Sequence, residues 1–188
     1  ATTRALDNLL DDGVVLDNAT VFAFGKAALP MAQAALARLT IRTGRVHYPG
    51  PSGQLGPLHL VESGHPVPAA DAAERGREML DLAASLKAGD VALCLVSGGG
   101  SAMLEAPRPG LDVAEVARRT RELMAGGADI ATLNRARSEL SLLKAGGLAR
   151  AIRPATVINV VINDVPTAGP ELVASGPTMI GGVRTVVA

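Results

Sequence analysis

Residues 91–101 read VALCLVSGGGS, and this stretch decides the fold class. Residues 91–96 are all apolar, as expected for a β-strand that is covered on both faces of a sheet. The strand passes directly into a glycine-rich turn, Ser97-Gly98-Gly99-Gly100-Ser101. A buried strand that ends in such a turn is typical of parallel sheets whose strands alternate with helices.

Two more runs resemble this strand: residues 21–24, which are apolar, and residues 157–162, which are apolar except for Asn159. Because helix-like segments separate the runs, we predict an α/β fold. Residues 1–188 then form one three-layer, Rossmann-like domain with a mostly parallel sheet. The predicted helices cover residues 27–39, 70–88, 112–124 and 130–144, and two short strands cover residues 45–48 and 58–62.

Composition and charge exclude several functional classes. Lys+Arg 18 balance Asp+Glu 18, and aromatic residues make up only 2%, so we expect no nucleic-acid partner. No apolar run approaches the ~18 residues of a membrane-spanning helix, so we expect no membrane partner. The single cysteine, Cys94, lies in an apolar run and is interpreted as inert core. Without an apparent signal peptide, the expected location is cytoplasmic.

Unusual residues follow three of the predicted strands. Gly25-Lys26 follows the first, residues 97–101 follow the second, and Asn163-Asp164 follow the third. Ligands of open parallel sheets bind beyond the carboxyl ends of the strands. The three strand ends together therefore predict a ligand site at one edge of the sheet.

The segment Ser97, Gly98, Gly99, Gly100 and Ser101 is named the glycine loop. Three residues without Cβ atoms let consecutive backbone N–H groups face an oxygen-rich ligand. The alternative is a flexible turn, but the position directly after a buried strand favours an anion-binding loop. The loop is not a Walker A motif, because no Gly-Lys-Ser/Thr follows it. It is not a Rossmann Gly-x-Gly-x-x-Gly fingerprint either, because Met103 stands at the third glycine position.

Two charged residues at strand ends have competing interpretations. Lys26 is positioned to neutralise a phosphoryl or carboxylate group, although an isolated lysine is more often simply solvated. Asp164 is a candidate Mg²⁺ ligand, and a turn-forming aspartate is an equally good interpretation.

Two further sets of polar residues are candidates for ligand binding. The spacing of Asn134, Arg137 and Lys144 is compatible with one face of a helix, which is more often a solvated stripe than a site. Glu62 and His65 flank a proline-rich turn, where His65 either contacts a ligand or hydrogen-bonds the loop.

The order of these motifs resembles the type 2 glycerate kinase family, whose members are often labelled hydroxypyruvate reductase as well. The resemblance covers about residues 20–180. It rests on these motifs in order: Gly25-Lys26-Ala27-Ala28, Glu62-x-Gly64-His65-Pro66-Val67-Pro68, the glycine loop, Asn134-x-x-Arg137, Lys144-Ala145-Gly146-Gly147-Leu148-Ala149, Asp164-Val165-Pro166 and Ala174-Ser175-Gly176-Pro177-Thr178.

The resemblance implies a kinase that uses ATP and Mg²⁺ to convert D-glycerate to 2-phosphoglycerate. It implies a larger Rossmann-like domain, which this chain resembles, and a smaller C-terminal domain that we expect to be absent. Lys26 matches the family's catalytic lysine, and the glycine loop matches its ligand-binding loop. Arg137 and Lys144 match basic positions beside the cleft between the domains, and Asp164 matches the acid after the last strand.

The chain also departs from the family pattern. Thr167-Ala168-Gly169-Pro170 stand after Asp164-Val165-Pro166, where the family usually has two further acids. A non-catalytic domain that binds a small molecule or nucleotide is therefore the alternative. A nicotinamide-dependent hydroxypyruvate reductase ranks last, because no dinucleotide fingerprint is present. A homodimer or a separate C-terminal domain is the expected protein partner.

Overall fold

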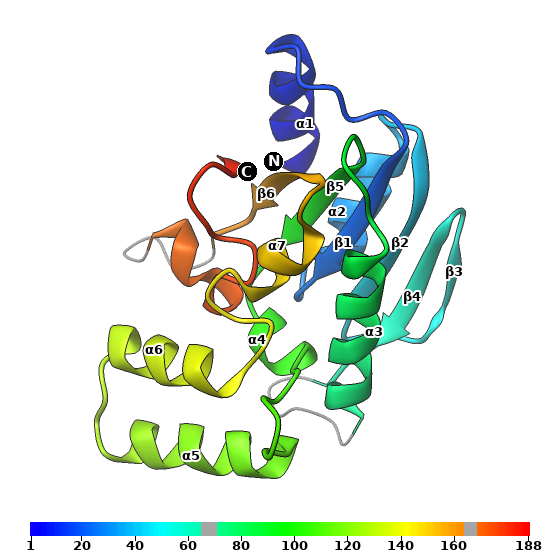
Figure 1. Ribbon diagram of the computed structural model, residues 1–188. Helices are drawn as coiled ribbons and strands as arrows, with labels where there is room; N and C mark the ends of the chain where they lie inside the picture. The colour runs from blue at the N-terminus through cyan, green and yellow to red at the C-terminus, as the bar shows by residue number, and fades with distance from the viewer. Residues whose placement is uncertain (65–70, 164–168) are drawn as a thin grey trace.

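The computed structural model describes residues 1–64, 71–163 and 169–188, and it contains one seven-stranded sheet in the order β3-β4-β2-β1-β5-β6-β7 (Figure 1). Among these strands only β3 and β4 pair antiparallel, and all the other neighbours pair parallel. The predicted α/β fold with a mostly parallel sheet is therefore confirmed. The strands are β1 (Ala19–Phe24), β2 (Ile41–Tyr48), β3 (Gly53–Leu55), β4 (Leu58–Glu62), β5 (Val91–Val96), β6 (Thr156–Val161) and β7 (Arg184–Val187).

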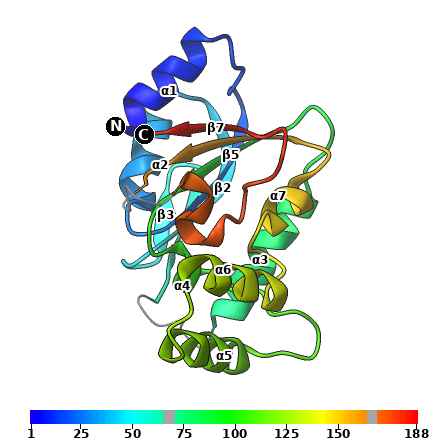
Figure 2. The same ribbon diagram turned by 90° about the vertical axis from the view of Figure 1, so that its left-hand side faces the viewer.

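Helices cover both faces of the sheet. In Figure 2, α1 and α2 lie on one side of the strands, and α3 and α7 lie on the other. The described helices are α1 (Thr2–Asp11), α2 (Ala28–Leu36), α3 (Ala72–Ala84), α4 (Gly100–Met103), α5 (Val113–Ala125), α6 (Ile130–Leu140), α7 (Gly147–Ile152) and the 3-10 helix η1 (Pro170–Ser175).

Strand β1 shows how the two faces form two hydrophobic cores. Its side chains alternate, so Val21 and Ala23 pack with α1 and α2 in one core. Phe22 and Phe24 point the other way and pack with residues of α3 and α7 in the second core. All six residues of β1 are buried, which explains why its sequence is apolar throughout.

The structure corrects several predicted boundaries. The third predicted helix is confirmed almost to the residue, because the Asp112 carboxylate caps it by accepting the Glu115 N–H at 2.7 Å. The predicted helix over residues 130–144 ends early, at Leu140. Ser141 is extended and forms a β-bridge with Pro107, which removes Lys144 from the helix. Strands β3 and β7 were not predicted from the sequence.

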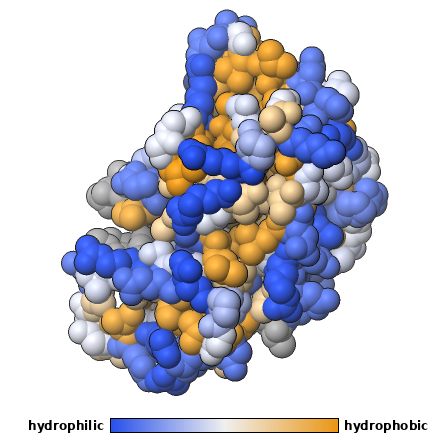
Figure 3. All heavy atoms as spheres, in the orientation of Figure 1, coloured by the Kyte–Doolittle hydropathy of each residue, from blue (hydrophilic) through white to orange (hydrophobic). Residues whose placement is uncertain are grey.

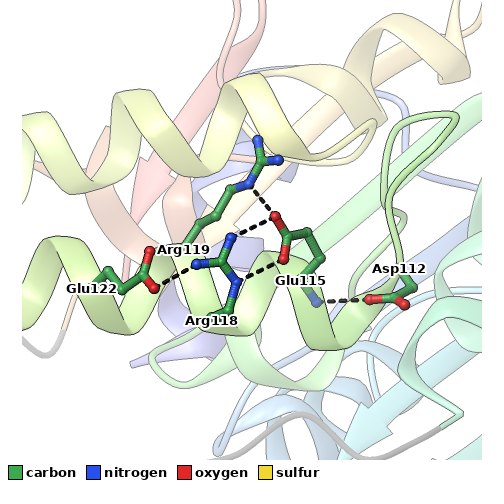
Figure 4. A network of polar contacts seen from close by, with 5 residues as sticks. All are labelled: Asp112, Glu115, Arg118, Arg119 and Glu122. Atoms are coloured by element: carbon green, nitrogen blue, oxygen red, sulfur yellow. Dashed lines mark hydrogen bonds and ion pairs between the residues drawn. The ribbon is translucent and has the colours of Figure 1, made fainter.

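Helices α5 and α6 lie together beyond the carboxyl-terminal edge of the sheet in Figures 1 and 2, and we call this pair the helical arm. Only Val116 of α5 is fully buried. On the polar surface of α5, the Glu115 carboxylate forms ion pairs with two arginines (Figure 4). Its Oε1 lies 2.8 Å from Arg118 Nη2 and 2.6 Å from Arg119 Nε. The two arginines lower the pKa of Glu115 to about 2. Such i,i+3 and i,i+4 pairs support a helix that has few buried contacts.

None of the helices in the described ranges is both long enough and apolar enough to span a lipid bilayer.

Gly76 provides a test of the packing between α3 and the segment after α4. A Cβ atom at this position would lie 2.0 Å from the Glu105 carbonyl oxygen. Alanine favours a helix by about 1 kcal/mol over glycine, but overpacking against backbone costs about 1–3 kcal/mol or more. We expect Gly76→Ala to lower the free energy of unfolding by at least about 1 kcal/mol in urea titrations.

The matched control is Gly53→Ala, because a Cβ atom on Gly53 meets nothing within 4 Å. This variant should change the free energy of unfolding by less than about 0.5 kcal/mol. Equal stability of the two variants would contradict the close approach of α3 to Glu105.

Candidate functional site

The carboxyl ends of β1 and β5 meet at the centre of the sheet edge. The Ser97 N–H donates to the Phe24 carbonyl at 3.1 Å, and the Lys26 N–H donates to the Gly98 carbonyl at 2.9 Å. The Ser97 side chain is buried, and its Oγ accepts the Ala27 N–H at 3.0 Å. The predicted proximity of Gly25-Lys26 and the glycine loop is confirmed.

Gly25 makes this approach sterically feasible. Its φ is +121°, and a Cβ atom there would lie 2.3 Å from Ser97 Oγ and 2.4 Å from the Ser97 carbonyl oxygen. Any side chain at this position would separate the two strand ends. Lys26, the next residue, is exposed, so its ammonium group is available to a ligand at the edge of the sheet.

The glycine loop is held closely against its neighbours. Gly99 has a φ of +86°, and a Cβ atom on Gly100 would lie 2.9 Å from both the Phe24 ring and Ala174 Cβ. Within the described ranges, no backbone hydrogen bond uses the N–H groups of Gly98 or Gly99. The loop therefore offers two adjacent backbone donors, as the anion-binding interpretation requires.

A second segment fastens the end of the glycine loop. Ser101 Oγ lies 2.7 Å from Ser175 Oγ, the last residue of η1. The Ser175 carbonyl in turn accepts the Ala145 N–H at 2.9 Å. Ala145, Ala174 and Ser175 all have left-handed φ values, of 47°, 53° and 63°. Such non-glycine conformations are strained and cluster at functional sites, so they mark this contact as part of the candidate site.

Lys144, which precedes Ala145 in the chain, forms a buried ion pair with Glu105. Lys144 and Glu105 have side chains only 5% and 2% exposed, and Lys144 Nζ donates to Glu105 Oε2. The other carboxylate oxygen of Glu105 accepts the Ala106 N–H at 3.0 Å. Burial lowers the pKa of Lys144, and the Glu105 carboxylate opposes that shift. Sequence reasoning did not single out Glu105, because its partner lies 39 residues away.

Arg137 lies in the last turn of α6. Its side chain is half-buried, and no hydrogen bond or ion pair joins it to another residue in the described part of the chain. Burial lowers the pKa of its guanidinium group, and the Glu105 carboxylate opposes this effect. The predicted alignment of Arg137 with Lys144 on one helix face is wrong, since α6 ends at Leu140.

The structure places the other predicted residues as follows. Glu62 is exposed at the end of β4, and its N–H donates to Ser52 Oγ at 2.9 Å. His65 and Asp164 fall outside the described residues, as does the Asn134 side chain. Their predicted contributions to ligand binding stay predictions.

A buried histidine at the same edge was not predicted from the sequence. His47 is fully buried at the end of β2, and its carbonyl accepts the Gly25 N–H at 3.1 Å. The Ser63 hydroxyl donates to the Val61 carbonyl, so it accepts from Nδ1–H of His47 at 3.3 Å. Nε2 of His47 is then an acceptor, and neither it nor the buried Nη1 of Arg75 has a partner in the described structure.

The described residues do not form a metal centre. No group of three or more His, Cys, Asp or Glu side chains among them is arranged to hold an ion. Glu105, the buried carboxylate of the site, is already paired with Lys144. These residues alone do not fit a Mg²⁺ site.

A hollow lies within the helical arm. Its volume is about 550 Å³, and its lining includes Arg119, Glu122, Leu123 and Ala136. No residue of the glycine loop contributes to it. It is therefore separate from the strand-end residues.

A protein family described as "Domain of unknown function (DUF4147)" matches residues 3–185. The chain belongs to this family. It is 37% identical over 166 residues to the D-glycerate 2-kinase of Thermotoga maritima, a match that covers 86% of this chain and 40% of that protein. It is 46% identical over 115 residues to the glycerate kinase of Danio rerio, with 61% and 23% coverage.

A crystal structure of glycerate kinase from Thermotoga maritima has the same fold. The TM-score is 0.85 at 34% identity, and the match covers 97% of this DUF4147 chain and 45% of that one. The chain thus spans less than half the length of these relatives. The resemblance predicted from the order of the motifs is confirmed at the level of the family.

The buried His47 predicts a pH-dependent stability. Burial, together with the charges of Arg45 and Arg75, lowers its pKa from 6.5 to about 3. Between these values the unfolded chain binds a proton that the native chain does not, so stability falls as the pH is lowered. We expect His47→Asn to weaken this dependence between about pH 7 and about pH 5, as measured by urea unfolding.

The control is His59→Asn, because His59 is exposed on β4. It should leave the pH dependence as in the unsubstituted chain. If His47→Asn also leaves it unchanged, His47 is not held neutral by burial.

Proposed function

We propose that this chain supplies the anion-binding part of a glycerate 2-kinase, which transfers the γ-phosphoryl group of ATP to the 2-hydroxyl group of D-glycerate. The observation that carries the proposal is the glycine loop, whose Gly98 and Gly99 N–H groups have no backbone acceptor among the described residues. The kinase names of the relatives support the choice of substrates.

The reaction needs few covalent contributions from the protein. The 2-hydroxyl oxygen attacks the γ-phosphorus, the bond to the ADP oxygen breaks, and the hydroxyl proton is released. Catalysis of phosphoryl transfer rests mainly on positioning and on stabilising negative charge. Backbone N–H groups of the glycine loop and the exposed ammonium of Lys26 suit that task, because both lie at one edge of the sheet.

The geometry favours a rigid site. Ser97 Oγ accepts a hydrogen bond from the Ala27 N–H, and Ser101 Oγ is hydrogen-bonded to Ser175 Oγ. Both ends of the glycine loop are therefore fixed before a ligand arrives. Donors that are already in place lose little entropy on binding and need no reorganisation as charge develops.

Mg²⁺ is expected to accompany ATP, where it neutralises phosphate charge. Because the described residues do not fit a Mg²⁺ site, no step is assigned to the metal. Asp164 remains the candidate ligand from the sequence and lies outside the described residues.

We also propose that this chain associates with a second protein surface. Figure 3 shows apolar residues gathered on the face near α1, and Val15 and Val187 are 72% and 55% exposed. Strand β7, which carries Val187, is the outermost strand of the described sheet on its side. An exposed edge with apolar side chains favours association with a second protein surface. A second copy or a separate domain stays the expected partner.

Lys26 gives the direct test of the proposed site. We expect D-glycerate and Mg-ATP to bind this chain in calorimetric titrations, and Lys26→Ala to weaken the binding of at least one of them. Loss of a hydrogen bond to a charged group costs about 1.5–3 kcal/mol, which corresponds to about tenfold or more in affinity.

The matched control is Lys87→Ala. Lys87 is also exposed, but it precedes β5 and so lies at the opposite edge of the sheet. This variant should bind as tightly as the unsubstituted chain. Unchanged affinities in Lys26→Ala would refute the role of Lys26, and binding of D-glycerate without any binding of Mg-ATP would favour a non-catalytic domain.

A further inference from the structure

The helix at the end of the glycine loop, α4, is too short to hold its position without outside contacts. It has only the four residues Gly100–Met103, and a single helical turn is unstable by itself. The place of α4 therefore depends on the contacts at its two ends. Because Gly100 and Ser101 belong both to the glycine loop and to α4, whatever fixes this helix also fixes the loop.

The start of α4 is held through η1 and the segment 141–146. Ser101 Oγ lies 2.7 Å from Ser175 Oγ. The Ser175 carbonyl accepts the Ala145 N–H at 2.9 Å, and the Gly176 carbonyl accepts the Gly146 N–H at 2.7 Å. The position of Ser175, and with it that of Ser101, is therefore tied to the segment that contains Lys144.

The end of α4 is held by the same segment. Glu105 is the second residue after the helix, and its buried carboxylate accepts a hydrogen bond from Lys144 Nζ. The other Glu105 oxygen accepts the Ala106 N–H at 3.0 Å, and the Ala106 carbonyl accepts the Leu142 N–H at 2.8 Å. The segment 141–146 thus reaches both ends of α4.

Lys144 is enclosed by the protein. Its side chain is only 5% exposed, and that of Glu105 is 2% exposed. Lys26, in contrast, is exposed at the sheet edge, where a ligand can reach its ammonium group. Removal of one partner from a buried ion pair leaves the other charge without compensation, so such a pair resists separation. The pair therefore keeps the end of α4 against the segment 141–146.

We infer that Lys144 is a positioning residue, whose ion pair with Glu105 fixes α4 and so holds the glycine loop in the conformation that binds the anion. Lys144 itself does not contact the anion, which differs from the direct contact that the sequence favours. The inference rests on the proposed function, because it takes the glycine loop as the anion-binding element.

A single and a double variant test this role by calorimetric titration with D-glycerate. Lys144→Met leaves the Glu105 carboxylate buried without its partner, so the affinity should fall at least about tenfold. Glu105→Gln/Lys144→Met removes both charges and keeps an acceptor for the Ala106 N–H. Its affinity should return to within about threefold of that of the unsubstituted chain. An equal loss in both variants would mean that the Lys144 ammonium contacts the anion, which overturns the inference.

NMR spectra of the ligand-free variants report on the glycine loop directly. The Gly98 and Gly99 amide signals should shift in Lys144→Met and return toward their original positions in the double variant. A role in stability alone would leave these signals in place, and unchanged signals in Lys144→Met would overturn the inference.

The matched control is Leu6→Ala. Leu6 is fully buried on α1, in the core that contains Val21 and Ala23, so this variant destabilises the fold through a cavity that does not involve α4. It should change neither the affinity for D-glycerate nor the Gly98 and Gly99 signals. A fall in affinity as large as that of Lys144→Met would attribute the effect to general destabilisation and would contradict the positioning role.

Thermal unfolding of each variant reports whether it folds. If Lys144→Met does not fold, the double variant still decides, because it lacks the Lys144 ammonium but leaves no buried charge unpaired. Affinity within about threefold of the original supports the inference, and a loss of about tenfold or more overturns it.

Inorganic phosphate separates this inference from the proposed function. If the unsubstituted chain binds phosphate but not D-glycerate, the proposed substrate is wrong, while loss and recovery of phosphate affinity in the two variants still support the role of Lys144. If D-glycerate binds equally well to Lys144→Met, the inference is overturned and the proposed function stands. Absence of binding by both anions overturns both.

Discussion

The close approach of Gly25 to Ser97 is the constraint on which the site depends. A Cβ atom on Gly25 would lie 2.3 Å from Ser97 Oγ, so only glycine allows β1 and β5 to end so near each other. Because of this proximity, Ser97 Oγ accepts a hydrogen bond from the Ala27 N–H, and the Lys26 N–H donates one to the Gly98 carbonyl. It therefore places an exposed lysine at the same point of the sheet edge as a loop whose Gly98 and Gly99 N–H groups have no backbone acceptor among the described residues.

The rest of the fold supports this point from two directions. The two hydrophobic cores fix β1 from both faces, because Val21 and Phe22 point to opposite sides of the sheet. Beyond the sheet, η1 fixes the end of the glycine loop through Ser175, in a left-handed conformation that only surrounding contacts can maintain. The same segment links the loop to Ala145, the neighbour of Lys144 in the buried ion pair with Glu105. The glycine loop is thus fixed both by the packing of β1 and by its contact with η1.

The sequence was informative wherever local pattern decides the structure. The apolar run of β5, the turn after it and the Asp112 cap all depend on neighbouring residues, and parallel pairing then brings Gly25-Lys26 to the glycine loop. The end of α6 was not predictable in this way, because it depends on the bridge between Ser141 and Pro107. Glu105 and His47 were missed for the same reason, since their roles arise from partners distant in sequence.

The account makes one central claim, that a small carboxylate binds at the glycine loop beside Lys26. The most direct measurement is a titration of the ¹⁵N-labelled chain with D-glycerate, followed by NMR. The account predicts that the Gly98, Gly99 and Lys26 backbone amide signals shift together, with a common affinity. Shifts confined to the hollow of the helical arm, at Leu123 and its neighbours, or no shifts at all, would contradict it.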